Sequence, residues 1–290
     1  MSLVVDAHAH VFASSDRDAR SVSELVPAGR TATRDAYREQ LDRARVDHAV
    51  LVPLDPVDEY VAASLAADSQ RFRAIAIASP VDLGRTGPDP VEHLRRRREV
   101  FPFAGVRTMW LGEPGSSLAA SSVGPLLSYM QTEGLILWSY LPPDQAPFLP
   151  QVGKSYPELR VVLNHLGFTP QDMRVDDQVR PWFATGLTPQ RHDEVMDLAR
   201  FPSFHLMFSG LYALSHEPYP YADLRDPVVS LVEAFGPQRT MWASDWPWIE
   251  AEPGYDRTRE LVDITFGHLT ETDRGSILGG TASRLFGFGG

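Results

Sequence analysis

Cysteine is absent from the 290-residue chain, which excludes disulfide bonds, thiolate metal ligands and a cysteine nucleophile. Long apolar runs are absent as well, because none approaches the roughly 18 residues that a membrane-spanning helix needs. The N-terminus enters the first apolar segment without a basic stretch and an apolar stretch before it, so we expect no signal peptide. A membrane partner is therefore not expected, and we take a cytoplasmic location as the default.

Positive charge is scarce, since 27 Lys and Arg residues stand against 38 Asp and Glu residues and the formal net charge is −11. Nucleic acids bind clustered positive charge, so they are not expected as partners. The one basic run, "LRRRRE" at 94–99, lies in a segment with helical character, and we interpret it as a solvated helix face. With 43% hydrophobic and 22% charged residues, the composition is typical of a globular protein.

Short apolar runs recur along the chain, and each is followed by a polar turn and then by helical periodicity. The strand candidates are 3–10, 48–53, 72–80, 103–110, 135–141, 160–167, 203–211 and 240–248. The helical candidates are 33–46, 56–69, 89–100, 121–132, 145–156, 190–199, 224–235, 255–267 and 271–278. Strands buried on both faces that alternate with helices imply a parallel sheet covered by helices. Eight such units predict an α/β fold, a single-domain (β/α)₈ TIM barrel over residues 1–290. The alternative is an open doubly wound sheet, but the sequence has no glycine-rich motif after the first strand to support it.

Polar residues stand where several of these strands end. The stretch "VVDAHAH" at 4–10 ends in His8 and His10, which share one face of a strand because they are two residues apart. His165 closes the sixth strand and Asp245 the eighth, and active sites of such barrels lie at this end of the strands. Three histidines and a carboxylate suit Zn²⁺, with Mn²⁺ or Fe²⁺ as alternatives. We therefore predict one divalent metal, with zinc first, although each residue alone could also be a satisfied polar group.

Four motifs together resemble the amidohydrolase superfamily. They are "DAHAH" at 6–10, "NHLG" at 164–167, "FSGLY" at 208–212 and "WASDWPW" at 242–248. Within the superfamily they are similar to the amidohydrolase-related branch, which contains lactonases, hydratases and decarboxylases. The resemblance spans nearly the whole chain and implies that His8 and His10 match the strand-one pair, His165 the strand-six histidine and Asp245 the strand-eight aspartate.

The sequence departs from that pattern at strands four and five, where many metal-dependent members carry a further histidine or a carboxylated lysine. Ser139 and Tyr140 stand near this place, and Lys154, the only lysine, lies away from any strand end. A binuclear site bridged by a modified lysine is therefore not expected. What remains resembles a mononuclear centre or the lactonase sub-branch, in which some members work without metal, so metal-free catalysis stays an alternative.

This residue set predicts a hydrolase that opens a lactone or a related cyclic ester. Asp245 would take a proton from the attacking water and return it to the leaving oxygen, and His165 is the second catalytic candidate. Without metal, the histidines would donate hydrogen bonds to the developing oxyanion. A metal-dependent decarboxylase is the first alternative, and release of carbon dioxide would distinguish it. A barrel that binds a small acid or a metal without turnover is the remote alternative.

Side chains at the same end of the barrel are candidates for substrate binding. Arg107, near the end of the fourth strand, suits a substrate carboxylate because its planar fork matches one, and an ion pair with an acidic residue at the rim is the alternative. The other candidates, from strand ends and loops, are Tyr140, Tyr212, His216 and Trp246. The expected partner is thus a small molecule with a carboxylate, while the oligomeric state, a homo-oligomer included, stays open.

Segment 170–192 reads as a long polar excursion after the sixth strand, and we interpret it as a lid over the site. Its Arg174, Arg180 and His192 are expected to face an acidic substrate. His205, inside the seventh strand, is expected to be a packed histidine instead of a functional one.

Overall fold

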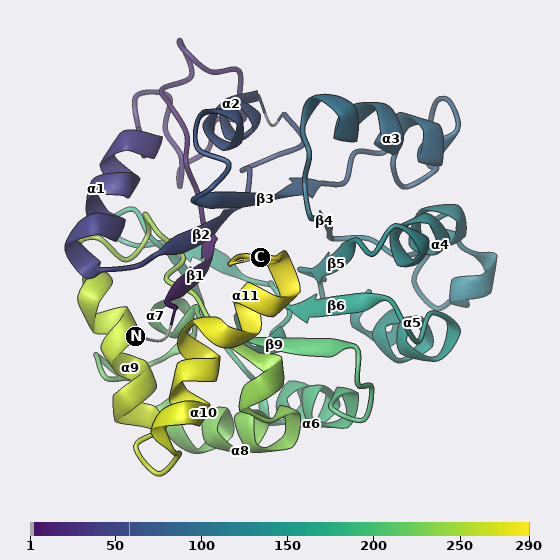
Figure 1. The fold of residues 1–290 in the computed structure, drawn as a ribbon. Coiled ribbons are helices and arrows are strands. Elements are labelled where there is room, and N and C mark those ends of the chain that lie inside the picture. Colours follow the sequence, from purple (N-terminus) through teal and green to yellow (C-terminus); the bar gives the residue numbers. More distant parts are fainter. Residues whose placement is uncertain (1–2, 58, 290) are drawn as a thin grey trace.

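The computed structural model describes residues 3–57 and 59–289, and its strands form a barrel of eight parallel strands (Figure 1). These are β1 (Val5–Ala9), β2 (His48–Leu51), β3 (Phe72–Ile77), β4 (Gly105–Thr108), β5 (Ile136–Ser139), β6 (Arg160–Leu163), β9 (Phe204–Phe208) and β10 (Thr240–Trp242). Neighbours in this order pair in parallel. The backbone N–H of His10 donates to the carbonyl of Trp246 at 2.7 Å, which brings the last strand back to the first. The predicted TIM barrel is confirmed.

Helices follow the strands and cover the outside of the barrel. They are α1 (Arg34–Ala44), α2 (Glu59–Ala67), α3 (Pro90–Val100), α4 (Gly124–Thr132), α5 (Leu149–Ser155), α6 (Pro189–Leu198), α8 (Arg225–Phe235), α9 (Tyr255–Thr265) and α10 (Glu271–Gly275). Helices start where the sequence supplies caps: the Thr33 side chain accepts from the N–H of Ala36, and the Thr188 side chain accepts from that of Arg191. Within the described residues, no helix has the length and apolarity required to cross a bilayer.

Apolar side chains pack in two layers, one inside the barrel and one between the strands and the helices. The interior layer includes Val5, Val50, Ile75 and Trp138, all fully buried. The C-terminal helix α11 (Thr281–Phe286) lies across the barrel in Figure 1 and packs its apolar side chains against this layer. Each large apolar side chain that is fully buried stabilises the fold by roughly 1.5–3 kcal/mol. One end of the barrel is thus closed, and polar chemistry is left to the other end.

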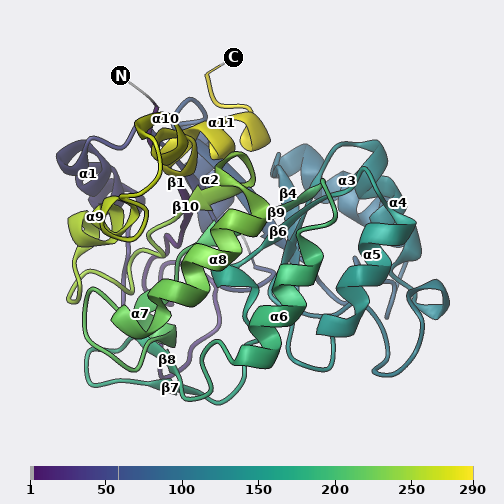
Figure 2. The same ribbon diagram turned by 90° about the horizontal axis from the view of Figure 1, so that it is seen from below.

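The excursion after β6 has structure that the sequence interpretation did not predict. β7 (Met173–Val175) and β8 (Pro181–Phe183) pair as an antiparallel hairpin. α6 starts at Pro189, so His192 belongs to a helix of the barrel and not to the excursion. Figure 2 shows the hairpin and the short helix α7 (Leu211–Leu214) at the end of the molecule opposite both chain termini. This is the end at which the parallel strands terminate.

Candidate active site

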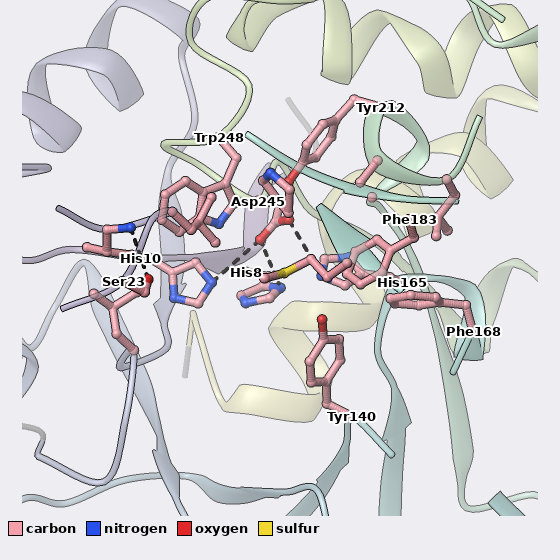
Figure 3. A pocket seen from close by; sticks show the side chains of 18 of the residues that line it. His8, His10, Ser23, Tyr140, His165, Phe168, Phe183, Tyr212, Asp245 and Trp248 are labelled. Atoms are coloured by element: carbon pink, nitrogen blue, oxygen red, sulfur yellow. Dashed lines mark hydrogen bonds and ion pairs between the residues drawn. The ribbon is translucent and has the colours of Figure 1, made fainter. Parts of the chain in front are cut away.

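His8, His10, His165 and Asp245 meet at the C-terminal mouth of the barrel (Figure 3). The Asp245 carboxylate lies among the three rings: its Oδ1 is 3.6 Å from His8 Nδ1 and 3.6 Å from His10 Nε2. Its Oδ2 is 3.5 Å from His165 Nε2. All four side chains are buried. The tertiary structure therefore brings together the four residues that the sequence placed at strand ends.

A β-bulge in β1 aims the histidine pair at the mouth. The register with β2 shifts between Asp6 and Ala9, because this segment of β1 is one residue longer than the segment of β2 that it pairs with, Ala49 to Leu51. Strict alternation would put Asp6 on the face of His8, but the Asp6 carboxylate instead accepts hydrogen bonds of 2.7 Å from Tyr37 and from Tyr255. The bulge thus separates a structural carboxylate from the histidines that follow it.

The backbone at the other two site residues is left-handed. Asp245 has φ +63° and His165 has φ +43°, a region that residues other than glycine rarely adopt. The surrounding structure holds this conformation, since the N–H of Asp245 donates to the His8 carbonyl at 3.0 Å. Such backbone conformations cluster at functional sites, where they aim a side chain that a regular strand would turn elsewhere.

Hydrogen bonds orient two of the histidine rings. His10 Nδ1 lies 2.8 Å from the Val52 carbonyl, which can only accept, so this nitrogen carries a proton. A neutral His10 ring then presents the lone pair of Nε2 toward Asp245. His165 Nδ1 lies 2.8 Å from Ser209 Oγ, and its Nε2 likewise faces the carboxylate. Outer contacts of this kind fix the ring orientation and tautomer of metal-binding histidines.

Burial sets the protonation states of the site. It lowers the pKa of His8 well below its ordinary value, although Asp245 opposes that shift, and it lowers the pKa of His165 to about 4. Burial raises the pKa of Asp245, but the neighbouring histidines outweigh it, and the pKa falls below its ordinary value. Neutral imidazoles and an ionised carboxylate are the forms that bind a divalent metal.

Several buried polar atoms in this site have no hydrogen-bond partner in the part of the chain that the structure describes. They are both ring nitrogens of His8 and Oδ1 of Asp245. Buried polar atoms are normally paired, and an unpaired set points to a water or an ion. His8, His165 and Asp245 each offer one ligand atom, and these atoms lie within 4.8 Å of one another. The residues present therefore fit one divalent cation, with His10 facing the same carboxylate.

The segment "FSGLY" at 208–212 supports the site in ways that residue-by-residue reasoning missed. Besides the contact from Ser209, Gly210 has φ +77°, and a Cβ there would lie 2.7 Å from His165 Nδ1. Only glycine lets this backbone approach the ring so closely. The hydroxyl of Tyr212 donates to Asp245 Oδ2 at 2.8 Å. The segment is one of the four motifs that carry the family resemblance, and this signal could have marked Ser209 and Gly210.

A cavity that opens at the mouth of the barrel contains the four site residues. Three of the residues proposed to bind substrate, Arg107, Tyr140 and Tyr212, also line this cavity. The Arg107 guanidinium lies 4.2 Å from the centre of the Tyr140 ring, and no carboxylate of the described residues forms an ion pair with it. Burial lowers the pKa of Arg107, and it raises the pKa of Tyr140 to about 12. A partly buried cation thus lines the cavity, and none of the described carboxylates lies at contact distance from it.

Two predicted substrate contacts do not line this cavity, and both predictions are corrected. Trp246 extends the ladder between β10 and β1, which turns its ring outward onto Tyr37, with ring centres 4.7 Å apart. Trp248 lines the cavity in its place, with its ring 5.7 Å from that of His10. His216 follows the end of α7 and is exposed, because Asp223 holds its backbone N–H at the surface.

The polar residues of the excursion also lie elsewhere than expected. Arg180 pairs with Asp176 at 2.8 Å, and His192 Nε2 lies 2.7 Å from Ser230 Oγ. The Arg174 guanidinium lies against the ring of Trp182, 5.8 Å from its centre. The expectation that these three residues face the substrate is wrong, because each is engaged in the packing of the hairpin or of α6. The hairpin lines the cavity with other residues, Met173, Pro181 and Phe183.

Comparison with known proteins identifies the family. The amidohydrolase family model matches residues 5–288, so the chain belongs to the amidohydrolase family. An L-fucono-1,5-lactonase from Burkholderia ambifaria is 27% identical over 263 residues, which cover 85% of this chain and 81% of that protein. The resemblance predicted from the four motifs is therefore confirmed at the level of the family.

Solved structures share the fold over almost the full length. One is a probable 2-pyrone-4,6-dicarboxylic acid hydrolase from Acinetobacter baumannii with citric acid bound. It is 21% identical, with a TM-score of 0.75 over 99% of this chain and 100% of that one. Another is an amidohydrolase from Burkholderia multivorans with bound zinc, 19% identical, with a TM-score of 0.76 over 99% of each chain.

Proposed function

We propose that this amidohydrolase-family protein is a lactonase that opens the ring of a carboxylated lactone or related cyclic ester. The observation that carries the proposal is the Asp245 carboxylate, which lies within 3.6 Å of three histidine nitrogens in the cavity at the mouth of the barrel. The likeness to a lactonase and to a probable pyrone hydrolase supports hydrolysis of a cyclic ester.

We further propose that His8, His10, His165 and Asp245 hold one divalent cation, with zinc as the first candidate. The orphaned atoms of His8 and Asp245 support this, and so does the zinc bound in the Burkholderia multivorans structure. When bound, the cation would polarise the lactone carbonyl and lower the pKa of a water toward about 7. The donor set of nitrogen and oxygen atoms without sulfur is compatible with manganese and iron as well.

Asp245 is the proposed general base. The Tyr212 hydroxyl donates to Oδ2, so Oδ1, which has no hydrogen-bond partner among the described residues, is the oxygen that would accept a proton from the attacking water. The carboxyl group then returns that proton to the leaving ring oxygen. If the site works without metal, His165, whose Nδ1 lies 2.8 Å from Ser209 Oγ, would donate a hydrogen bond to the developing oxyanion.

Arg107 is the proposed binding residue for the substrate carboxylate. Its side chain carries a positive charge into the cavity, and stacking on Tyr140 holds the guanidinium plane in place. A guanidinium binds a carboxylate through two parallel hydrogen bonds, so it fixes orientation as well as supplying attraction. The ring of a substrate anchored at Arg107 would extend toward Asp245, since both line the same cavity.

The test combines metal analysis of the purified protein with a lactone hydrolysis screen, carried out before and after chelation. We expect about one zinc or other divalent metal per chain, ring opening of carboxylated lactones, and loss of activity on chelation that added metal restores. Activity that survives complete metal removal would leave the lactonase standing without the metal. Release of carbon dioxide from the substrate, without ring opening, would overturn the lactonase in favour of a decarboxylase.

A further inference from the structure

The cavity is built from two chemically different parts. Its inner part holds the three histidines and Asp245, which lie close together in Figure 3, and Arg107 also belongs to this part. Its outer wall comes from segments that continue beyond the strand ends. We define the outer wall as Leu25, Val26, Met173, Pro181, Phe183 and Leu214. We infer that the substrate carries an alkyl or aryl substituent that binds against this wall, an inference that rests on the proposed lactonase function.

The outer wall has few groups that could bind hydroxyls. Apart from the inner part, the tyrosines and the Trp248 indole, the polar side chains among the described lining residues are Ser21 and Ser23. Ser23 Oγ already accepts a hydrogen bond of 3.2 Å from the backbone N–H of Val26. A polyhydroxylated sugar lactone would leave hydroxyls without partners against such a wall. An apolar substituent would instead replace water there at no such cost.

The outer wall is fixed before any substrate binds. Arg30 donates to the Leu25 carbonyl at 2.8 Å and to the Val179 carbonyl at 2.6 Å. These bonds join the segment between β1 and α1 to the loop of the β7–β8 hairpin. Phe183 packs on Phe168, with ring centres 4.7 Å apart, and is itself nearly fully buried. A preformed apolar surface binds a matching group without a large ordering penalty. The wall is therefore a binding surface and not a loose cover.

Met173 is the adaptable part of the wall. It lines the cavity and yet is 50% exposed, which is unusual for so apolar a side chain. Methionine is unbranched and flexible, so it can follow substituents of different length. A substituent that reached the mouth would cover part of its exposed surface. Substrates with longer alkyl groups should therefore gain contacts that short ones lack.

The test uses 5-oxotetrahydrofuran-3-carboxylic acids that carry a methyl, butyl or hexyl group at ring position 2. These lactones share one ring and one carboxylate and differ only in apolar length. A buried methylene is worth roughly a fourfold gain, so we expect kcat/KM to rise on the order of tenfold or more from methyl to butyl. D-glucaro-1,4-lactone, which is carboxylated and hydroxylated, should have a lower kcat/KM than the butyl compound.

Two variants test whether the dependence of kcat/KM on alkyl length comes from the outer wall. Met173→Gln keeps the length of a half-exposed side chain and makes it polar, and we expect it to reduce the butyl-to-methyl ratio of kcat/KM by about threefold or more. Ile264→Gln, on the surface of α9 and 45% exposed, is the matched control and should leave that ratio unchanged. If the butyl-to-methyl ratio of kcat/KM is the same in Met173→Gln as in Ile264→Gln, the inference is overturned.

The outcomes separate this inference from the proposal beneath it. A kcat/KM that stays level or falls with chain length, while the methyl compound is still hydrolysed, would overturn the apolar substituent and leave the lactonase intact. Preference for D-glucaro-1,4-lactone would do the same. Failure to hydrolyse any of the four lactones would remove the lactonase proposal and the inference together.

Discussion

The hydroxyl of Tyr212 donates a 2.8 Å hydrogen bond to Asp245 Oδ2, the oxygen that also faces His165. Tyr212 comes from α7 after β9, and Asp245 comes from the loop after β10, so the bond joins two neighbouring segments of the barrel mouth. Oδ2 therefore has a hydrogen-bond partner, whereas Oδ1 has none among the described residues. The first prediction follows from this division.

Tyr212→Phe should lower kcat/KM about tenfold to a hundredfold, because a hydrogen bond to a charged group is worth roughly 1.5–3 kcal/mol. Metal content should change little, since Tyr212 offers no ligand in the proposed set. Steady-state kinetics and metal analysis check both points. Tyr129→Phe, on the outer helix α4, is the matched control and should keep the rate of the unmodified protein. An equal rate in Tyr212→Phe would show that this bond does not serve catalysis.

Asp245→Asn should lower kcat by on the order of 10² to 10⁴, the usual contribution of a general base. The amide keeps the shape of the carboxylate and cannot accept the proton from water. Because a neutral amide is also a poorer metal ligand, metal content must be measured in the same preparation. Lost activity with metal retained supports the proton-transfer role, whereas loss of both identifies a ligand. Hydrolysis at the unmodified rate would contradict the mechanism.

Arg107→Lys should raise KM for a carboxylated lactone about tenfold or more and change kcat little, since an ammonium group cannot reproduce the paired hydrogen bonds. The comparison substrate is the same lactone without its carboxylate. Its KM should be nearly equal in both proteins, because Arg107 would then have no anion to bind. If the KM of the carboxylated lactone is unchanged, the anion is bound elsewhere.

His205 gives a prediction about stability and pH that does not involve the active site. Burial lowers its pKa from 6.5 to about 4, and its Nδ1 lies 3.1 Å from the Ser203 carbonyl. Between these two pH values, His205 is protonated in the unfolded chain and neutral in the folded chain. The free energy of unfolding therefore decreases as the pH falls from 6.5 toward about 4. This shift corresponds to at most about 3 kcal/mol.

His205→Asn should flatten this dependence, because the amide can still donate to Ser203 and does not titrate. Urea unfolding at about pH 7 and about pH 4.5 measures the loss in each protein, and the variant should lose roughly 2 kcal/mol less. Acidic groups titrate in both proteins, so the comparison cancels them. Equal losses would mean that His205 is not kept neutral by the fold. The structure places His205 partly buried within β9, which agrees with the expected packed histidine.

The sequence by itself determined the barrel and the ends of its strands. Strands that are buried on both faces appear in the sequence as continuous apolar runs. Each predicted run overlaps an observed strand, as 160–167 overlaps Arg160–Leu163. Because parallel strands end at one rim, residues at those ends, such as His8 and Asp245, could be placed together without knowing any distance. The apolar pattern of a strand and the position of its last residue are properties of short segments, so both can be predicted from the sequence.

The tertiary structure alone decided which side chains line the cavity. Trp246 and Trp248 look alike in the sequence, yet only Trp248 lines the cavity, because Trp246 continues the strand ladder and turns toward Tyr37. The polar composition of 170–192 predicted polar contacts with substrate, but a hairpin places its apolar residues inward and pairs Arg180 with Asp176. Such choices depend on a bulge, a left-handed residue or a hairpin register, and each reverses the direction of a side chain over a single residue. Local sequence patterns carry too little of that information, since the energies that select these turns come from contacts between segments distant in the chain.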